Sequence, residues 1–245
     1  MRIAVVADIH GNLPALEAVV RDFTHRGCDA VVNLGDSLSG PLLPLETAQF
    51  LLAQDWVHLA GNGERQILAG RPGQWNASDE FACSQLTSSE LGWIASLKPT
   101  ASVDHQVFLC HGTPKSDVEY FLETVEATHV RAATPREVDE RLGEVEASVV
   151  LCGHTHVSRS VRSSKSQLIV NPGSVGLPAY RDANPYPHVI ESGSPDARYA
   201  IVEKLAETWV TNLIAVPYAH MNMARLAHER GRDDWARALA SGYMV

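Results

Sequence analysis

The sequence predicts an α/β fold, which some schemes class as α+β, because short apolar runs alternate with segments of helical periodicity. The first run, residues 3–7, contains only small and β-branched apolar residues, as expected for a strand buried on both faces. Similar runs at 30–34 and 56–60 are separated by predicted helices at 14–27 and 45–52. This β-α-β-α-β order predicts parallel strands joined by right-handed crossovers.

The rest of the chain adds helices with clear start signals and strands of a different pairing type. Residues 70–98 are polar and helical in pattern, and capping boxes begin helices at Thr87 and Thr134. Two short helices are predicted within 218–244, separated at Gly231. Further strands are predicted at 106–110 and 149–152, followed by closely spaced runs that favour antiparallel pairing at 157–161, 168–170, 199–202 and 209–216.

One segment between these strands has no period. Residues 171–197 are rich in Gly, Pro and Tyr, which predicts a long loop that is either functional or mobile. No linker or internal repeat divides the chain, so we expect a single domain over residues 1–245.

Composition limits the cellular compartment and the binding partners that we expect. The 245 residues carry a formal net charge of −9 with no lysine- or arginine-rich run, which argues against stable binding to a nucleic-acid backbone. No apolar run reaches the length of a membrane span, and the first run is too short for a signal peptide, so we expect a cytoplasmic protein without a membrane partner.

The four cysteines are scattered without a CxxC pair. Cys110 and Cys152 end apolar runs and are interpreted as buried apolar side chains, with metal ligation or nucleophilic catalysis as the alternative.

Five predicted strands end in turns that combine glycine with a metal-capable side chain. Glycine lets the backbone turn sharply, so that the neighbouring side chain points inward. The carboxyl ends of strands are also where open α/β sheets place their ligands. The five turns are Asp8-x-His10-Gly11, Gly35-Asp36, Gly61-Asn62, His111-Gly112 and Gly153-His154-x-His156.

Together these turns supply two Asp, one Asn and four His. A closed structural zinc site uses four ligands, usually with thiolates, so this inventory does not fit one. It suits two divalent ions that share a bridging carboxylate and clamp the oxygens of an in-line displacement. The alternative is that these residues are helix caps, turn formers and core histidines that recur without a common role.

The five turns resemble the signature of the calcineurin-like metallophosphoesterases, which is D-x-H, GD, GNH[DE], H and GHxH in that order. All five blocks lie in order between residues 8 and 156, and Asn171-Pro-Gly-Ser174 resembles a loop of the small bacterial phosphodiesterase branch. The resemblance implies a four-layer αββα sandwich with two metal ions at the strand ends. By the same resemblance, one metal takes Asp8, His10 and His156, the other takes Asn62, His111 and His154, and Asp36 bridges them.

The sequence departs from this family at one position. Gly63 stands where the family has the histidine that protonates the leaving group or steadies the phosphoryl oxygens, while Glu64 retains the acidic neighbour. The chain therefore has no certain general acid, which puts monoesters and poor leaving groups in doubt. Other candidate substrate contacts are Asn12, for which capping the first helix is the favoured alternative, Arg65, which can equally be a surface residue, and Arg181. Arg181, Tyr180 and His188 lie in the long loop and could form part of a lid.

The resemblance implies a phosphodiesterase that hydrolyses a small phosphate diester by attack of a metal-bridging hydroxide. Nucleotide-derived diesters are the substrate class it suggests. Of the two divalent ions, we expect manganese first, with Fe, Ni or Zn as alternatives. The competing hypotheses are a phosphomonoesterase or dinucleoside-polyphosphate hydrolase using the same site, and a non-catalytic scaffold such as the retromer subunit that shares this fold.

Overall fold

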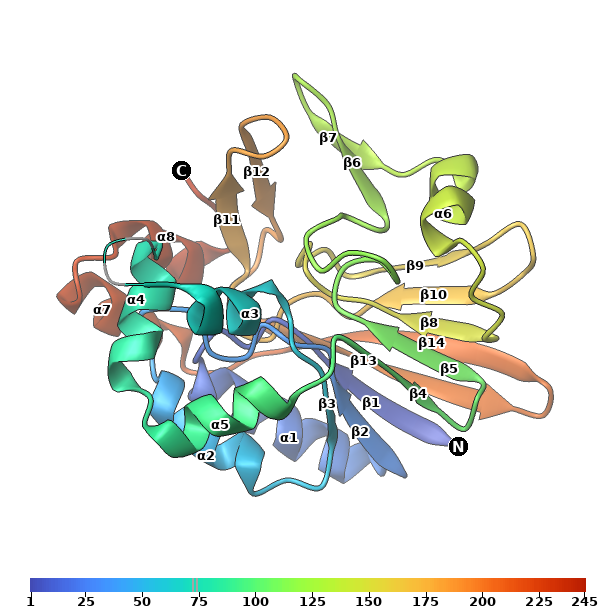
Figure 1. The fold of residues 1–245 in the computed structure, drawn as a ribbon, viewed down its shortest axis with the longest axis horizontal. Coiled ribbons are helices and arrows are strands. Elements are labelled where there is room, and N and C mark those ends of the chain that lie inside the picture. Colours follow the sequence, from blue (N-terminus) through green and yellow to red (C-terminus); the bar gives the residue numbers. More distant parts are fainter. Residues whose placement is uncertain (72, 74) are drawn as a thin grey trace.

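Two five-stranded sheets pack face to face in the computed structural model, which describes residues 1–71, 73 and 75–245 (Figure 1). The first sheet has the order β14 (Thr208–Val216), β13 (Ala197–Leu205), β1 (Arg2–Val6), β2 (Ala30–Asn33) and β3 (Val57–His58). The second sheet has the order β4 (Thr100–Val103), β5 (Val107–Cys110), β8 (Val149–Leu151), β10 (Leu168–Asn171) and β9 (Arg159–Arg162).

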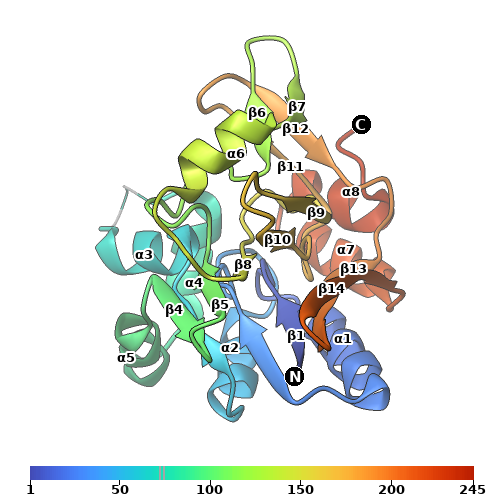
Figure 2. The ribbon, with the colours of Figure 1, turned by 90° about the vertical axis from the view of Figure 1, so that its right-hand side faces the viewer.

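Helices cover the outer faces of both sheets. Helix α1 (Leu13–Arg26) buries Leu16 and Val19 against the first sheet, and α6 (Pro135–Leu142) packs against the second sheet (Figure 2). The layers therefore run helix, sheet, sheet, helix, which confirms the predicted αββα sandwich. Helix α1 begins at the cap Asn12 and ends before Gly27, close to the predicted limits.

Strand β1 shows why its sequence is apolar at every position. Ile3 and Val5 belong to the core between the two sheets, whereas Ala4 and Val6 pack toward α1, and all four are fully buried. Burying a side chain such as Val or Ile contributes roughly 1.5–3 kcal/mol. A polar residue at any of these positions would have no access to water, so the run is apolar on both faces.

Strand pairing brings several carboxyl ends to one edge of the sandwich. β1 pairs in parallel with β2, and β2 with β3, while β5, β8 and β10 are parallel to one another. The predicted antiparallel pairing is found between β9 and β10 and between β13 and β14. The parallel strands β1, β2, β3, β5 and β8 are the ones that the five predicted ligand turns follow.

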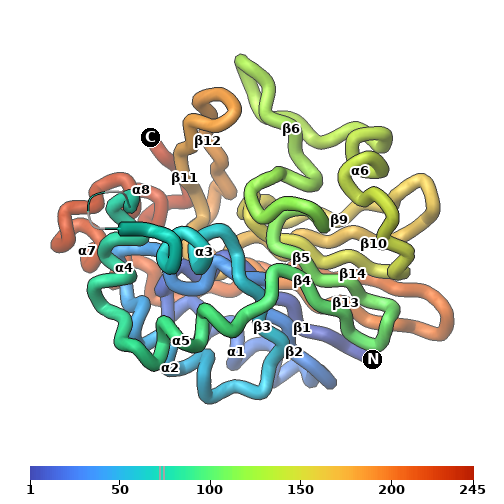
Figure 3. The backbone as a smooth tube through the Cα atoms, in the orientation of Figure 1, coloured from blue at the N-terminus to red at the C-terminus, as the bar shows by residue number. Residues whose placement is uncertain are grey.

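Two hairpins were not predicted from the sequence. One pairs β6 (Glu123–Val125) with β7 (Val130–Ala132), and the other pairs β11 (Ala179–Asp182) with β12 (His188–Glu191). The second lies within the segment expected to be a loop, so that expectation is corrected. Its strands pair only with each other. Because they are short, half polar and surrounded by turn residues, their sequences do not show a clear strand periodicity. Both hairpins rise from the same side of the sandwich (Figure 3).

The remaining helices follow the sequence signals with two differences. β3 is shorter than the predicted run at 56–60. Helix α3 (Asn62–Ala69), which was not predicted, begins shortly after that run. Within the predicted helical segment 70–98, residues 72 and 74 lie outside the described part of the chain. The other helices are α2 (Pro44–Leu52), α4 (Ala77–Gln85), α5 (Ser88–Ser96), α7 (His220–Glu229) and α8 (Asp233–Ser241).

Several smaller expectations are also met. The capping boxes at Thr87 and Thr134 are formed, and Gly231 separates α7 from α8 with a φ of 72°. Cys110 and Cys152 are buried against α6, and burial raises the pKa of both thiols, as expected for apolar core residues. In the described residues, every helix is too short or too polar to cross a membrane.

The half-buried His58 predicts a pH dependence of folding. Trp56 stacks on His58 and Trp93 meets it edge-on, and burial lowers the pKa of His58 to about 4. Between pH 6.5 and 4 the unfolded chain therefore binds a proton that the folded chain does not, so the free energy of unfolding falls as the pH falls. We expect His58→Phe to recover about 1–3 kcal/mol of this loss. Denaturant titrations at pH 7 and pH 5 measure it, and His25→Phe should keep the wild-type slope.

Candidate metal centre

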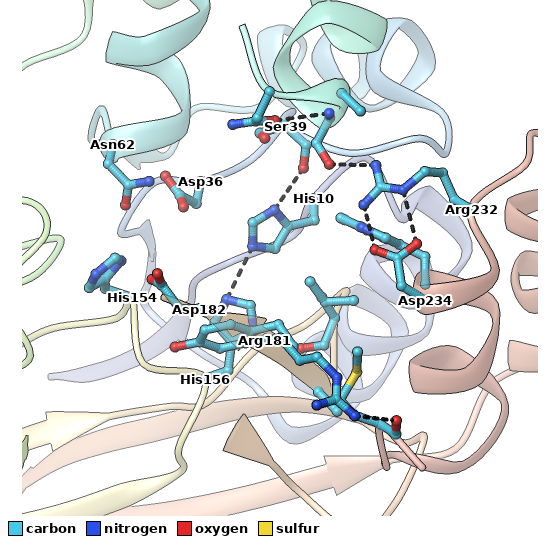
Figure 4. A pocket seen from close by; sticks show the side chains of 18 of the residues that line it. His10, Asp36, Ser39, Asn62, His154, His156, Arg181, Asp182, Arg232 and Asp234 are labelled. Carbon is cyan, nitrogen blue, oxygen red and sulfur yellow. Dashed lines mark hydrogen bonds and ion pairs between the residues drawn. The ribbon is translucent and has the colours of Figure 1, made fainter. Parts of the chain in front are cut away.

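The five predicted turns meet at one edge of the sandwich and bring all seven candidate ligands together. Two groups of three residues have ligand atoms within 4.8 Å of one another, namely Asp8, His10 and His156, and Asp36, His111 and His154. His111 Nε2 lies 3.4 Å from Asp36 Oδ1 and 3.9 Å from Asp8 Oδ1, so the two groups adjoin. The grouping matches the one implied by the family resemblance, with Asn62 beside the second group (Figure 4).

Each of the four imidazoles directs one nitrogen to a backbone carbonyl and the other into the centre. Such a bond fixes the tautomer, because the nitrogen that donates its N–H leaves a lone pair on the opposite nitrogen. The bonds are His10 Nδ1 to Ser39 O (2.7 Å), His156 Nδ1 to Leu177 O (2.7 Å), His111 Nδ1 to Leu34 O (2.9 Å) and His154 Nε2 to Val118 O (3.1 Å).

The inward lone pairs crowd one another unless a cation lies among them. His10 Nε2 is 3.1 Å from His156 Nε2, and the Asn62 amide oxygen is 3.2 Å from His111 Nε2 and 2.9 Å from His154 Nδ1. Rotating the Asn62 amide would let its NH₂ donate to His154 Nδ1 at 2.9 Å. With its oxygen facing them, the mixed carboxylate, amide and imidazole set suits divalent transition ions.

The charged side chains of the centre shift one another's pKa values. Asp8 and Asp36 are buried, which alone would raise their pKa values, but the neighbouring histidines hold both pKa values below the usual range. Burial likewise opposes charge on His111, yet Asp36 and Asp8 raise its pKa to about 10. A metal bound through His111 Nε2 would compete with a proton for that nitrogen.

Five of the seven ligands have a backbone conformation that L-residues rarely adopt. Their φ angles are positive: Asp8 54°, His10 52°, Asp36 53°, His154 69° and His156 59°. The left-handed region costs a non-glycine residue on the order of 1–3 kcal/mol. The sequence interpretation assigned the sharp turns to the neighbouring glycines, and Gly11 and Gly35 do have positive φ angles. The ligands themselves turn as well, which the sequence did not predict.

Backbone hydrogen bonds between the turns hold this geometry. Beyond the last paired residues of β1 and β2, the Asp8 N–H donates to Gly35 O (3.0 Å) and the His10 N–H donates to Asp36 O (3.0 Å). The two ligand turns are therefore bonded to each other rather than free to relax.

Glu64 is a fully buried carboxylate that the sequence analysis did not assign to the centre. It accepts N–H bonds from Asp36 (2.8 Å), Ser37 (2.8 Å) and Gly61 (2.9 Å), so it joins the turn after β2 to the start of α3. Burial and the charge of Asp36 raise the pKa of Glu64 to about 7, against the effect of these N–H bonds. The only sequence signal for this role was the position of Glu64 within the GNxE block.

Gly63 leaves no open space for the missing histidine. Its φ is not positive, but a Cβ added there would lie 3.0 Å from Ser39 Cβ and 3.1 Å from Asp36 Oδ1. Ser39 is held in this position because its hydroxyl donates to Asp79 Oδ1 at 2.6 Å. A Gly63→His variant must therefore displace Ser39 or a metal ligand.

The three predicted substrate contacts have different surroundings. Asn12 is fully buried and has the capping role that the sequence analysis favoured, at the start of α1, and its amide donates to Gly176 O and the Tyr218 hydroxyl. Arg65 forms a bidentate ion pair with Asp117 on the surface. Only Arg181 lines a pocket beside the metal centre, where it donates to Met244 O (Figure 4).

Two pockets adjoin the metal centre and share part of their lining. The first, of about 360 Å³, is walled by Arg181 and by Arg232 and Trp235 of α8. The second, of about 680 Å³, lies along the β6–β7 hairpin and includes Tyr120. Sequence reasoning missed the α8 residues because no local motif marks them. The residues common to both pockets are Asn62, Gln66, His154 and Asp182.

An αββα sandwich with these ligands at its strand ends has the architecture of a metal-dependent phosphoric ester hydrolase. Comparison with known proteins agrees. The calcineurin-like phosphoesterase superfamily domain matches residues 1–190, so the chain belongs to that superfamily.

The chain is also similar to solved structures and to a curated relative. A metallophosphoesterase from Sphaerobacter thermophilus is 25% identical, with a TM-score of 0.76 over 99% of this chain and 100% of its own. A hypothetical protein from Pyrococcus horikoshii OT3 is 17% identical, with a TM-score of 0.74 over 100% of this chain and 99% of its own, which shows a shared fold. An uncharacterized protein of Methanocaldococcus jannaschii is 35% identical over 66 residues, a match that spans 27% of this chain and 27% of that relative.

The role of Glu64 can be tested by removing its charge while keeping its shape. In Glu64→Gln an NH₂ group faces backbone N–H donors, so we expect a loss of about 1–3 kcal/mol in the free energy of unfolding. The loosened turn should also weaken metal binding by about 10–100-fold, as for other outer-shell partners. Thermal unfolding and metal titration measure both effects. Exposed Glu144→Gln is the matched control, and equal behaviour of the two variants would contradict this role.

Proposed function

We propose that this protein is a phosphodiesterase that uses two divalent cations. The observation that carries the proposal is that the metal centre lies where two pockets meet. A phosphorus atom bound at the shared residues Asn62 and His154 would have room for one ester substituent in the first pocket and another in the second. A monoester would leave one pocket without a ligand.

The ligand residues would divide between the two ions. Asp8, His10 and His156 would hold one, Asn62, His111 and His154 the other, and Asp36 would bridge them, with manganese as the first candidate and Fe, Ni or Zn as alternatives. When bound, the ions supply an activated water and stabilise charge on the phosphoryl oxygens. Two divalent cations and two aspartates leave a net positive site within an acidic protein, which favours an anionic ester.

The chain's own side chains then position the substrate. Arg181 and Arg232 place positive charge in the first pocket, although Arg232 is already paired with Asp234. Tyr120 and Arg141 line the second pocket. Aromatic and cationic groups on both sides of the phosphate suit substituents such as nucleosides, which supports nucleotide-derived diesters as the substrate class. The complete ligand set argues against the scaffold hypothesis.

The proposed function is tested with paired nitrophenyl esters. Metal-stripped protein should be inactive, and reloading with manganese should restore activity with two ions per chain by elemental analysis. We expect kcat/KM for bis(p-nitrophenyl) phosphate to exceed that for p-nitrophenyl phosphate by at least about tenfold, because only the diester fills both pockets. A preference for the monoester would favour the phosphomonoesterase alternative. Full activity without metal would overturn the proposal.

The bridging role of Asp36 gives a second test. Asp36→Asn keeps the shape of the side chain but removes the charge shared by two cations. We expect it to lower kcat/KM by at least about 100-fold, more than typical changes to outer-shell residues. Arg65→Ala breaks only an exposed ion pair and should remain within about fivefold of wild type. An Asp36→Asn enzyme with two bound metals and normal turnover would show that the ligand assignment is wrong.

A further inference from the structure

The second pocket lies between the two hairpins, beside the metal centre. Thr124 and Val125 of β6 line one side, and Asn184 and Pro185 line it from the turn between β11 and β12 (Figure 1). At about 680 Å³ it is larger than the first pocket, which has about 360 Å³. It reaches the metal centre through the lining residues that the two pockets share. A group attached to phosphorus there would extend directly into it.

Apolar side chains supply the part of this pocket that is free to contact a ligand. Val118 borders the metal centre, because its carbonyl oxygen lies 3.1 Å from His154 Nε2, and the residue is nevertheless 51% exposed. Val125 is half-buried and Pro185 is exposed. A ligand that covers these three side chains displaces water from apolar surface and breaks no hydrogen bond of the protein.

The polar side chains deeper in the pocket are already bonded to the protein. Arg141 Nη1 donates to Phe121 O and to Glu123 O, each at 3.0 Å. Arg141 Nη2 donates to Thr124 Oγ1 at 2.8 Å. The Glu123 carboxylate accepts a bond from Arg159 Nε at 2.7 Å, and at 2% exposure it is inaccessible to a ligand. A polar substituent would therefore lose its water without gaining partners from these groups.

The other polar groups of the lining do not favour a charged or hydroxylated substituent either. The Tyr120 hydroxyl lies 2.5 Å from the Tyr180 hydroxyl and 2.9 Å from His188 Nε2, so its bonds are taken up within the protein. Glu119 and Asp182 also line the pocket, and neither is buried. Their negative charges oppose the entry of an anionic group.

The first pocket offers a different surface. Arg181 lines it as an exposed side chain, and Nη2 is the only guanidinium nitrogen with a bond to the described residues, donating to Met244 O at 3.0 Å. Arg181 can therefore still donate to a ligand from its other nitrogens. The two pockets thus differ in the chemistry that they present on either side of the metal centre.

We propose that the second pocket selects an apolar alkyl or aryl ester substituent through Val118, Val125 and Pro185. The substrate is then a diester with an apolar group on one side of phosphorus. This inference rests on the proposed function, because it assumes that phosphorus is bound where the pockets meet.

The test measures binding, so that it does not depend on turnover. The manganese-loaded full chain is titrated by calorimetry with methyl-, ethyl-, propyl- and butylphosphonate, whose carbon–phosphorus bond is not an ester. Each added CH₂ should tighten binding about threefold, which gives a ratio of roughly 30 between the Kd values of the methyl and butyl compounds. The size-matched 3-hydroxypropylphosphonate should bind about tenfold more weakly than butylphosphonate, because its hydroxyl finds no free partner.

Variants show which pocket holds the alkyl chain. Val118→Thr and Val125→Thr keep the branched shape and replace one methyl group by a hydroxyl. Each should reduce the ratio of the methyl and butyl Kd values by at least about threefold. Val189→Thr makes the same change at an exposed position of β12 that lines neither pocket, and it should keep the wild-type ratio. Each variant must bind two metals by elemental analysis, and if Val118→Thr does not, Val125→Thr decides.

Three results would overturn the proposal. They are Kd values that do not depend on chain length, equal binding of butylphosphonate and 3-hydroxypropylphosphonate, and an unchanged ratio in the two pocket variants, which would place the chain outside the second pocket. The outcome for the proposed function is separate. A protein that shows the expected phosphonate selectivity but hydrolyses no diester would refute the phosphodiesterase assignment and not the selectivity of the pocket.

Discussion

The structure depends on holding five metal ligands in a backbone conformation that their side chains disfavour. Asp8, His10, Asp36, His154 and His156 all have positive φ angles, and together these cost several kcal/mol at the usual value for such residues. A strand that ended without this turn would direct its next side chains along the sheet edge. The left-handed turn instead aims each ligand into the space between β1, β2 and β8. The strained turns therefore let ligands from separate strands converge on one centre.

Rigid surroundings are needed to keep these turns from relaxing. The apolar core between the two sheets fixes the strand ends, and the bonds from Asp8 to Gly35 and from His10 to Asp36 tie two of the turns together. Glu64 adds three N–H bonds from the same region. A metal would favour the same conformation by its attraction to the converging lone pairs. The folded surroundings and a bound metal therefore favour the same backbone conformation of the ligand turns. Metal binding is expected to stabilise the fold for this reason.

The sequence predicted the sandwich and its ligand turns because both leave local signals. Apolar runs such as residues 3–7 and blocks such as Gly153-His154-x-His156 can be recognised without knowing what packs beside them. The pocket walls could not be predicted in this way. Tyr120 and Tyr180 are 60 residues apart, and their contact depends on a hairpin whose short, half-polar strands resemble a loop. Asn12 was ambiguous because a helix cap and a substrate contact use the same amide group, and only its burial decides between them.

The first pocket combines the metal-ligand turns with residues from the C-terminal helices. Every ligand turn lies within residues 1–190, the segment matched by the superfamily, whereas Arg232 and Trp235 reach the first pocket from α8. Trp235 also packs edge-on to the His10 ring, with centroids 5.8 Å apart, so this wall touches the metal centre directly. A change in α8 can therefore alter the shape and charge of the pocket without replacing a ligand.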